Sequence, residues 1–229
     1  MAARKAVNRL AGSYVLLYEP QLRELRWWLE QLRDPSQHCL PLASRISFPF
    51  ADEAHLVISY SDAARELNSP AESGYGAWTV FGDTLYYIAG LWSPSELATL
   101  SINVLELAAE NMATFTFLAQ ARSLGRGVTH TLDFVDNTAA EHSANRGKPS
   151  APAMQDLVAS RFDALDAANV FSSVERITSA ANDWADGLSR GSERAQEVIR
   201  MAEAAGLSAV QLFPLPEWRD LSQLRQSAH

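Results

Sequence analysis

The stretch GYGAWTVFGDTLYYIAGLW, residues 74–92, decides the fold because it has the pattern of two β-strands joined by a tight turn. Residues 74–81 and 84–92 are rich in aromatic and β-branched side chains, and Gly82-Asp83 between them is a short hairpin signal. An apolar run that ends at Asp62 precedes this pair. The three segments together predict a meander of three antiparallel strands.

The residues after the hairpin alternate between helical and strand-like patterns. An apolar helical stretch, residues 101–124, is stopped by Gly125-Arg126-Gly127, and a strand-like run then ends at Asp136. The segments that follow are two helical stretches, a strand candidate and a final helix, at residues 138–145, 153–168, 170–177 and 182–190. This order predicts an α/β fold with a mixed five-stranded sheet, three strands antiparallel and two parallel, flanked by helices.

The two ends of the chain have a different character, so the sequence predicts three parts: 1–50, 51–190 and 191–229. The first is a helical lead-in in which Leu22, Leu25, Leu29 and Leu32 recur at helical spacing. The last begins with an amphipathic helix, for which Ser192 is the expected N-cap and Gly206 the expected stop. An extended, proline-containing tail follows, which we interpret as packing or linker sequence.

Composition limits the class of protein. The chain has 229 residues, of which 47% are hydrophobic, which is enough for a packed core. No apolar run approaches the roughly 20 residues needed to cross a bilayer, and the N-terminus lacks the apolar core of a secretory signal. The lone Cys39 excludes an internal disulfide and a thiolate zinc site. We therefore expect a soluble intracellular protein, cytoplasmic or nuclear, with no membrane partner.

The charge balance argues against a general polyanion binder. The net charge is −8, whereas affinity for nucleic-acid backbones comes mostly from Lys and Arg side chains. The only lysines are Lys5 and Lys148, so the basic residues are nearly all Arg, which suits bidentate phosphate contacts. We expect modest affinity for nucleic acid from this chain alone.

Four carboxylates lie in settings that metal-dependent nucleic-acid cleavage requires. Asp62 and Asp136 each end a strand-like run, and parallel neighbouring strands would bring both to one rim of the sheet. Glu106 lies in a helix that is apolar almost all round, and Asp186 lies in the final helix. Each has an ordinary alternative, such as turn chemistry for the two aspartates and an exposed stripe, shared with Glu110, for Glu106. Clustered carboxylates would suit two Mg²⁺ ions, with Mn²⁺ as a substitute.

With these residues in place, the chain from about Leu56 to Arg190 resembles a type 1 ribonuclease H domain. It is most similar to the domain that follows reverse transcriptase in DIRS-like and related retroelements. The resemblance also covers the lead-in, which looks like the end of a reverse transcriptase thumb and its connection. The matching motifs, in chain order, are Ser61-Asp62-Ala63-Ala64, Gly74-Tyr75-Gly76-Ala77-Trp78, Ile102-Asn103-Val104-Leu105-Glu106-Leu107, Val135-Asp136-Asn137-Thr138-Ala139-Ala140, Asn145-Arg146-Gly147 and Asn182-Asp183-Trp184-Ala185-Asp186-Gly187-Leu188-Ser189-Arg190.

The resemblance implies a metal-dependent endoribonuclease that cleaves the RNA strand of an RNA–DNA hybrid, with Asp62, Glu106, Asp136 and Asp186 as metal ligands. A reverse transcriptase domain in the same polyprotein is the implied protein partner. Arg176 departs from the family pattern, because many members have a His at this position and an Arg cannot shuttle protons near neutral pH. The residues expected to contact the hybrid are Asn68, Asn103, Asn137, Arg146, Lys148 and Arg176.

Two alternatives remain open at the level of sequence. The first is a catalytically degenerate module of the same fold that positions nucleic acid or serves as a scaffold, which Arg176 and the acidic surface favour. The second is a DNA-directed nuclease of the wider superfamily, such as a resolvase or transposase core. Retention of four costly carboxylates argues against the first, and the hairpin meander argues against the second.

Overall fold

The structure of the protein is a computed structural model, which describes residues 55–66, 69–147, 149, 151–222 and 224, and positions 22, 23, 25, 26, 29 and 33. These six separate positions are helical and belong to the unit Met1–Pro49. The other described residues belong to a second unit, Phe50–His229. The rest of the predicted lead-in, residues 1–50, lies outside the described residues.

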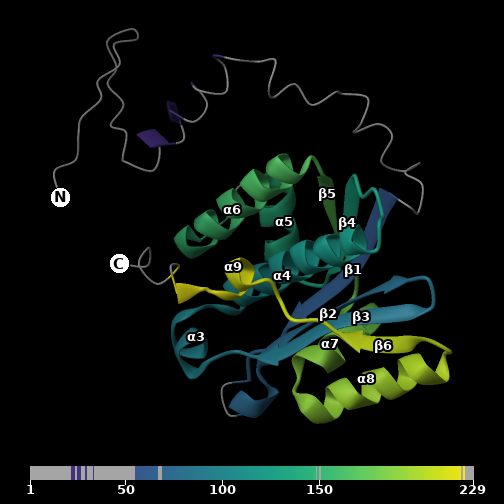
Figure 1. Ribbon diagram of the computed structural model, residues 1–229. Helices are drawn as coiled ribbons and strands as arrows, with labels where there is room; N and C mark the ends of the chain where they lie inside the picture. Colours follow the sequence, from purple (N-terminus) through teal and green to yellow (C-terminus); the bar gives the residue numbers. More distant parts are fainter. Residues whose placement is uncertain are drawn as a thin grey trace, which may run out of the picture. The chain divides into compact units, whose positions relative to one another are not determined.

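A mixed sheet with the strand order β5-β4-β1-β2-β3-β6 forms the centre of the second unit (Figure 1). The first three strands, β1 (Leu56–Ala63), β2 (Gly74–Phe81) and β3 (Thr84–Leu91), pair antiparallel. β4 (His130–Val135) pairs parallel with β1, and β5 (Phe171–Arg176) pairs parallel with β4. These directions confirm the predicted mixed sheet of the ribonuclease H-like fold.

The predicted number of five strands is wrong, because the sheet has six strands. β6 (Ser208–Gln211) pairs parallel with β3 over Thr84 to Tyr87. It is only four residues long, mostly exposed, and lies within the segment interpreted as a tail. Such a short edge strand has too little apolar periodicity to stand out in the sequence. The C-terminal segment therefore contributes a strand to the sheet.

Helices cover the two faces of the sheet unequally (Figure 1). One face carries α4, α5, α6 and α9, and the opposite face carries α7 and α8 against β2, β3 and β6. The described part of this unit also contains the short helix α3 and the 3-10 turns η4 and η5. The bounds are α3 (Pro94–Thr99), α4 (Ile102–Ser123), α5 (Thr138–Arg146), α6 (Pro152–Ala168), α7 (Asp183–Ser189), α8 (Ser192–Ala204), α9 (Pro216–Arg219), η4 (Pro70–Glu72) and η5 (Ser179–Ala181).

Two helices end next to glycines in the left-handed backbone conformation. Gly147 after α5 has φ 64° and Gly206 after α8 has φ 86°, a region that costs other residues free energy. The expected stop at Gly206 is thus confirmed, whereas the N-cap of α8 is Gly191, one residue before the predicted Ser192. Within the described part of the chain, no helix has the length and apolar character to span a bilayer.

Candidate active site

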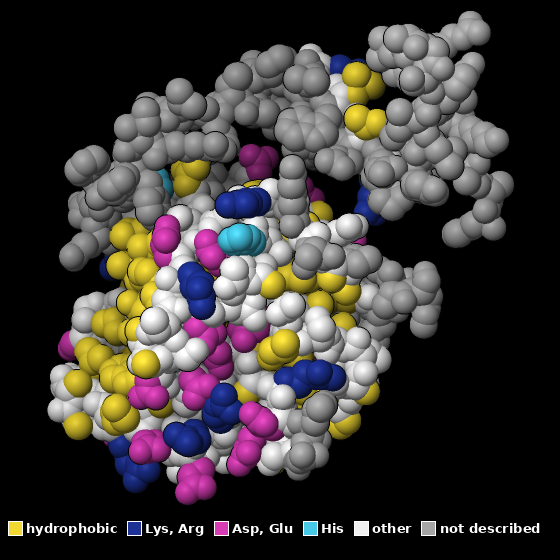
Figure 2. Space-filling model, turned by 180° about the vertical axis from the view of Figure 1, so that it is seen from behind, with side chains coloured by type: hydrophobic (Ala, Val, Ile, Leu, Met, Phe, Trp, Pro, Cys, Tyr) yellow, Lys and Arg dark blue, Asp and Glu magenta, His cyan; other side chains and the backbone are white. Residues whose placement is uncertain are grey.

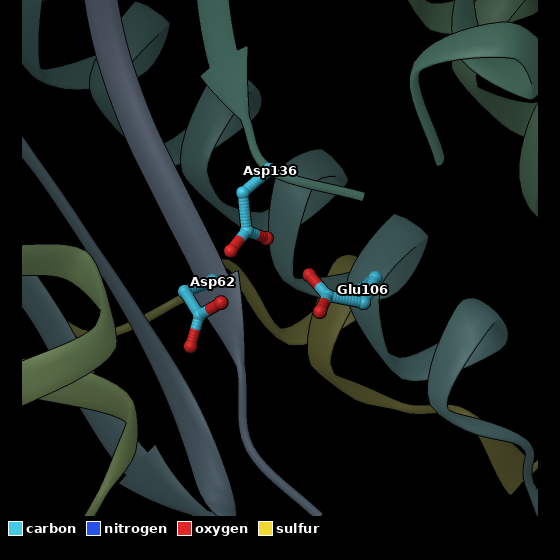
Figure 3. Close-up of side chains that lie close together, drawn as sticks. All are labelled: Asp62, Glu106 and Asp136. Atoms are coloured by element: carbon cyan, nitrogen blue, oxygen red, sulfur yellow. The ribbon is translucent and has the colours of Figure 1, made fainter. Parts of the chain in front are cut away.

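Two of the predicted acids lie level with each other on neighbouring strands. β1 and β4 run parallel with Tyr60 opposite Phe134, and Asp62 and Asp136 each follow two residues later. Asp62 is part of β1, whereas Asp136 lies just beyond the end of β4. Their carboxylates approach each other at the same rim of the sheet (Figure 3). The predicted convergence of these two residues follows from the parallel register.

Glu106 reaches the same place from α4, which crosses over β1 (Figure 3). Oxygens of Asp62, Glu106 and Asp136, one from each carboxylate, lie within 4.8 Å of one another. Asp62 is 5% exposed and Glu106 is 6% exposed, so these two carboxylates are shielded from water, whereas Asp136 is partly exposed. The Ala63 backbone N–H hydrogen bonds to the Glu106 carboxylate, but Glu106 Oε2 is buried with no hydrogen-bond partner among the described residues.

The electrostatics of this cluster are unfavourable without a cation. Burial raises the pKa of the Asp62 carboxyl to about 6, and repulsion by Asp136 and Asp186 acts in the same direction, while the hydrogen bond from Ser189 opposes it. Burial also raises the pKa of Glu106 well above its ordinary value, and the charges of Asp62 and Asp136 add to the effect. Like charges at such short range disfavour simultaneous ionisation unless a cation compensates them.

The donor set fits a hard divalent cation. All three side chains offer carboxylate oxygens, which are the ligands that Mg²⁺ and Mn²⁺ prefer. Oε2 of Glu106 is a buried acceptor without a hydrogen-bond partner among the described residues. Burying it in this way costs free energy, which a bound ion would offset. Asp62, Glu106 and Asp136 are therefore the residues that would hold a metal ion here.

Asp186 lies beside this cluster but outside the group of three. Its charge contributes to the raised pKa of both Asp62 and Glu106, so it lies within electrostatic range. Its Oδ1 accepts a hydrogen bond from Arg190 Nε at 2.7 Å, and Arg190 Nη1 also contacts Glu66 Oε1 at 3.0 Å. The structure thus brings three of the four predicted acids together and pairs the fourth with an arginine.

Two predicted hybrid-contacting residues support each other next to the acids. Asn137 is the N-cap of α5, where its Oδ1 accepts hydrogen bonds from the N–H groups of Ala139 and Ala140. Its Nδ2 donates to Asn103 Oδ1 at 3.2 Å, which links the start of α5 to the first turn of α4. A capping role therefore accounts for Asn137 whether or not it contacts a ligand.

The remaining predicted contact residues are exposed arginines or lie outside the description. Arg146 is exposed in the last turn of α5. Arg176 is exposed at the end of β5, and its Nε donates to the main-chain carbonyl of Asp136 at 3.4 Å. Arg176 thus lies at the edge of the acid cluster. Asn68 and Lys148 lie outside the described residues.

A buried network of charged side chains that the sequence did not predict lies beneath the cluster. Glu110 does not form an exposed stripe with Glu106, because its Oε1 lies 2.7 Å from Arg161 Nη1 and both side chains are buried. Asp133 accepts from Ser59 Oγ at 2.5 Å and lies 3.4 Å from Arg161 Nη2. The signal was present in α6, where Arg161 falls on the apolar stripe of Met154, Leu157 and Leu165.

Charged side chains are unevenly distributed on the face drawn in Figure 2. Acidic side chains gather near the middle of that face, with Lys and Arg side chains between and around them. Hydrophobic side chains collect along one edge of the same view. An acidic centre with separate arginines around it is an arrangement that could hold cations and meet phosphates at its margin.

Comparisons with known proteins returned matches only among solved structures. No protein-family model matches the chain. No curated protein matches it either. The N-terminal ribonuclease H domain of a Mycobacterium tuberculosis protein is 23% identical, with a TM-score of 0.45, over 58% of this chain and 95% of that one.

Two further solved structures illustrate the range of the matches. LC11 ribonuclease H1, in complex with an RNA/DNA hybrid, is 18% identical with a TM-score of 0.42, over 58% of this chain and 92% of that one. The nuclease domain of the human cytomegalovirus terminase is 14% identical with a TM-score of 0.34, over 80% and 84%. Because these identities lie below 25% and the TM-scores below 0.5, the fold stands on the strand order and pairing of this chain itself.

Proposed function

We propose that this chain is a metal-dependent endoribonuclease that hydrolyses the RNA strand of RNA–DNA hybrids. The observation that carries the proposal is the cluster of Asp62, Glu106 and Asp136, built from β1, α4 and the end of β4. These three elements adjoin one another at the junction of the antiparallel and parallel halves of the sheet. Mg²⁺ is the ion we propose, with Mn²⁺ as a substitute.

The chain's own residues would divide the work at this site. Asp62, Glu106 and Asp136 would hold cations, with Asp186 as a further ligand once it leaves Arg190. Divalent ions held by these residues would activate water for attack and would stabilise the charge on the leaving oxygen. Arg176, at the edge of the cluster, would contribute charge rather than proton transfer, because its guanidinium stays protonated at working pH.

Recognition of the hybrid would use the polar and basic residues around the acids. Asn103 and Asn137 form a connected amide pair beside the cluster, suited to minor-groove and 2′-OH contacts on the RNA strand. Arg146 would contact phosphate from the end of α5. We further propose that the activity serves reverse transcription of a retroelement, next to a reverse transcriptase domain in the same polyprotein.

A hybrid-cleavage gel tests the proposal. A labelled RNA–DNA hybrid is incubated with the full chain with Mg²⁺, with Mn²⁺ and with chelator, beside double-stranded DNA and double-stranded RNA. We expect cleavage of the hybrid's RNA strand only when metal is present. Asp62→Asn and Glu106→Gln should abolish it, whereas Asp163→Asn, at an exposed position of α6, should leave it unchanged.

The alternative function is a degenerate module of the same fold that positions nucleic acid. The pairing of Asp186 with Arg190 and the presence of Arg176 near the acids favour it. No cleavage by a folded chain at any metal concentration, together with hybrid binding, would establish this alternative. Cleavage of double-stranded DNA in place of the hybrid would point to a DNA-directed nuclease.

A further inference from the structure

The last turn of α7 contacts two of the acids with different side chains. Ser189 Oγ lies 2.6 Å from Asp62 Oδ2 and 2.9 Å from the main-chain carbonyl of Asp186. The shorter contact is to a carboxylate, so Asp62 is the favoured acceptor of the single hydroxyl proton. Ser189 is 0% exposed, so no water competes for this bond. The hydroxyl therefore fixes the orientation of Asp62.

Arg190 contacts the other acid, Asp186, and this contact opposes cation binding. Its guanidinium pairs with both Asp186 and Glu66: Nε lies 2.7 Å from Asp186 Oδ1, and Nη1 lies 3.0 Å from Glu66 Oε1. A carboxylate that is neutralised and oriented by a guanidinium is less available to a metal ion. All three side chains are about a third or more exposed, so the ion pairs are weak enough for a divalent cation to displace.

The helix that carries these residues is fixed against the sheet, below β2 in Figure 1. A Cβ added at Gly76 would lie 2.6 Å from both the Ala185 carbonyl oxygen and the Leu188 carbonyl carbon. A Cβ at Gly74 would lie 2.9 Å from the Ser189 carbonyl oxygen. The α7 backbone therefore rests directly on β2 at these glycines. Side chains, and not the backbone, can therefore adjust at this site. Arg190 and Asp186 form the pair of side chains that is about a third exposed.

We propose that Ser189 and Arg190 are positioning residues that make cation binding at this site occur in two unequal steps. In the first step a cation binds Asp62, Glu106 and Asp136, with Asp62 already oriented by Ser189. In the second step a further cation recruits Asp186, which must first leave Arg190. The inference rests on the proposed metal-dependent function and adds the order of binding and the residues that set it.

Metal titration of the full chain without nucleic acid tests this order. Mn²⁺ is added and the free ion is measured by electron paramagnetic resonance, which separates tight from weak sites. Asp186→Asn identifies the second step, because it should leave the first intact. Ser189→Ala should weaken the first step by tenfold or more, in the range of changes to residues that orient metal ligands. Arg190→Gln should tighten the second step about two- to fivefold, as expected when an exposed ion pair no longer competes.

Controls separate positioning from a general loss of structure. Arg194→Gln removes a charge from the exposed face of α8 and should change neither step. Glu66→Gln removes only the second partner of Arg190, so Arg190 then pairs with Asp186 alone and the second step should weaken, opposite in sign to Arg190→Gln. A destabilised fold would weaken both steps in every variant, whereas positioning predicts opposite signs for Ser189→Ala and Arg190→Gln. Circular dichroism checks that each variant is folded.

The result can contradict this inference independently of the proposed function. Unchanged Mn²⁺ affinity in Ser189→Ala, or a weaker second step in Arg190→Gln, overturns the positioning roles even if the hybrid is cleaved. Two-step binding with the expected opposite signs, but no cleavage of the hybrid, supports the positioning roles and removes the nuclease. Failure of the unaltered chain to bind Mn²⁺ overturns both.

Discussion

Glu110, one helical turn after Glu106 in α4, forms a buried ion pair with Arg161 of α6, with 2.7 Å between Glu110 Oε1 and Arg161 Nη1. Arg161 also donates to Asn111 and Ser172 and lies near Asp133, so it joins α4, α6, β4 and β5. Asp133 lies on β4 three residues before Asp136. The pair therefore ties together the elements that carry two of the clustered acids.

Removing the cation of this network should be strongly destabilising. Arg161→Met leaves Glu110 buried without its counter-ion, and breaking a buried pair in this way costs about 3–5 kcal/mol. Adding Glu110→Gln to the same chain should recover part of the loss, because the orphaned charge is gone. Urea denaturation of the single and double variants measures both effects. Arg122→Met, which removes an exposed arginine of α4, should stay within about 1 kcal/mol of the unaltered chain. Equal losses in Arg161→Met and Arg122→Met would contradict the role given to the pair.

The stability of the metal-free protein should fall as the pH rises. Burial raises the pKa of Asp62 from 3.8 to about 6 in the folded chain, so the folded state holds this proton more tightly than the unfolded state does. The contribution is complete below pH 3.8 and is lost as the pH rises through about 6, amounting to about 3 kcal/mol. Glu106 acts in the same direction. Urea denaturation with chelator at several pH values measures the fall.

Two comparisons attribute this pH dependence to the acid cluster. Addition of Mg²⁺ should restore stability at neutral pH, because a bound cation compensates the ionised carboxylates. Asp62→Asn should reduce the dependence between pH 4 and pH 6 and leave the part that comes from Glu106 and Glu110, whose pKa values burial also raises. A metal-free chain that is equally stable at both ends of this range would show that burial and neighbouring charges do not raise the pKa of the Asp62 carboxyl as described.

The sequence contained enough information for the fold and for three of the acids. The hairpin at Gly82-Asp83 and the apolar run ending at Asp62 have clear local patterns. The structure forms β1, β2 and β3 in these segments. Asp62 and Asp136 could be paired in advance because each ends a strand and parallel neighbours bring their ends together. Pairing Asp62 with Asp136 needed only periodicity and chain direction, whereas Glu106 was added by the resemblance to ribonuclease H domains.

The features that could not be predicted depend on contacts between particular side chains, several of which are far apart in the sequence. Two glutamates spaced by four residues on an apolar helix predict repulsion, and nothing local shows that Arg161 pairs with Glu110. Asp186 is a similar case. Arg190 lies four residues later in the sequence, but the sequence does not show that the two side chains form an ion pair. β6 was missed because four mostly exposed residues carry little pattern.

Removing one acid should separate stability from catalysis. Asp136→Asn deletes a ligand of the cluster and should abolish hybrid cleavage. It should also stabilise the metal-free protein, by an amount on the order of 1 kcal/mol, because the Asp136 charge contributes to the raised pKa of Asp62 and Glu106. The gel described above and urea denaturation measure the two effects, with Asp163→Asn as the control. Retained cleavage by a folded variant would show that Asp136 is not catalytic.

The C-terminal segment should be required for the stability of the second unit. Trp218 in α9 stacks on Phe115 of α4, with 4.0 Å between ring centroids and 5° between planes, and Arg219 Nη1 lies 2.7 Å from Glu96 Oε1. Trp218→Ala should therefore cost about 3 kcal/mol in the free energy of unfolding. Phe213→Ala is the matched control, because Phe213 is 83% exposed and should change little. Similar small effects of both changes would mean that this segment is a linker, one of the two roles, packing or linker, that its sequence suggested.

Hybrid binding should be weak and should show a shallow salt dependence. Log affinity falls with log salt in proportion to the number of phosphates neutralised, roughly 0.9 per contact on a B-form duplex. With a net charge of −8, only a few such contacts are expected from this chain, and more once a reverse transcriptase portion is attached. Arg146→Ala, at the exposed end of α5, should reduce the slope by about one contact. Arg200→Ala, on the exposed face of α8, should leave the slope unchanged. Fluorescence anisotropy with a labelled hybrid in chelator, across a salt series, measures all three chains without cleavage. A steep slope in the unaltered chain, or one that Arg146→Ala does not change, would place the phosphate-binding surface elsewhere.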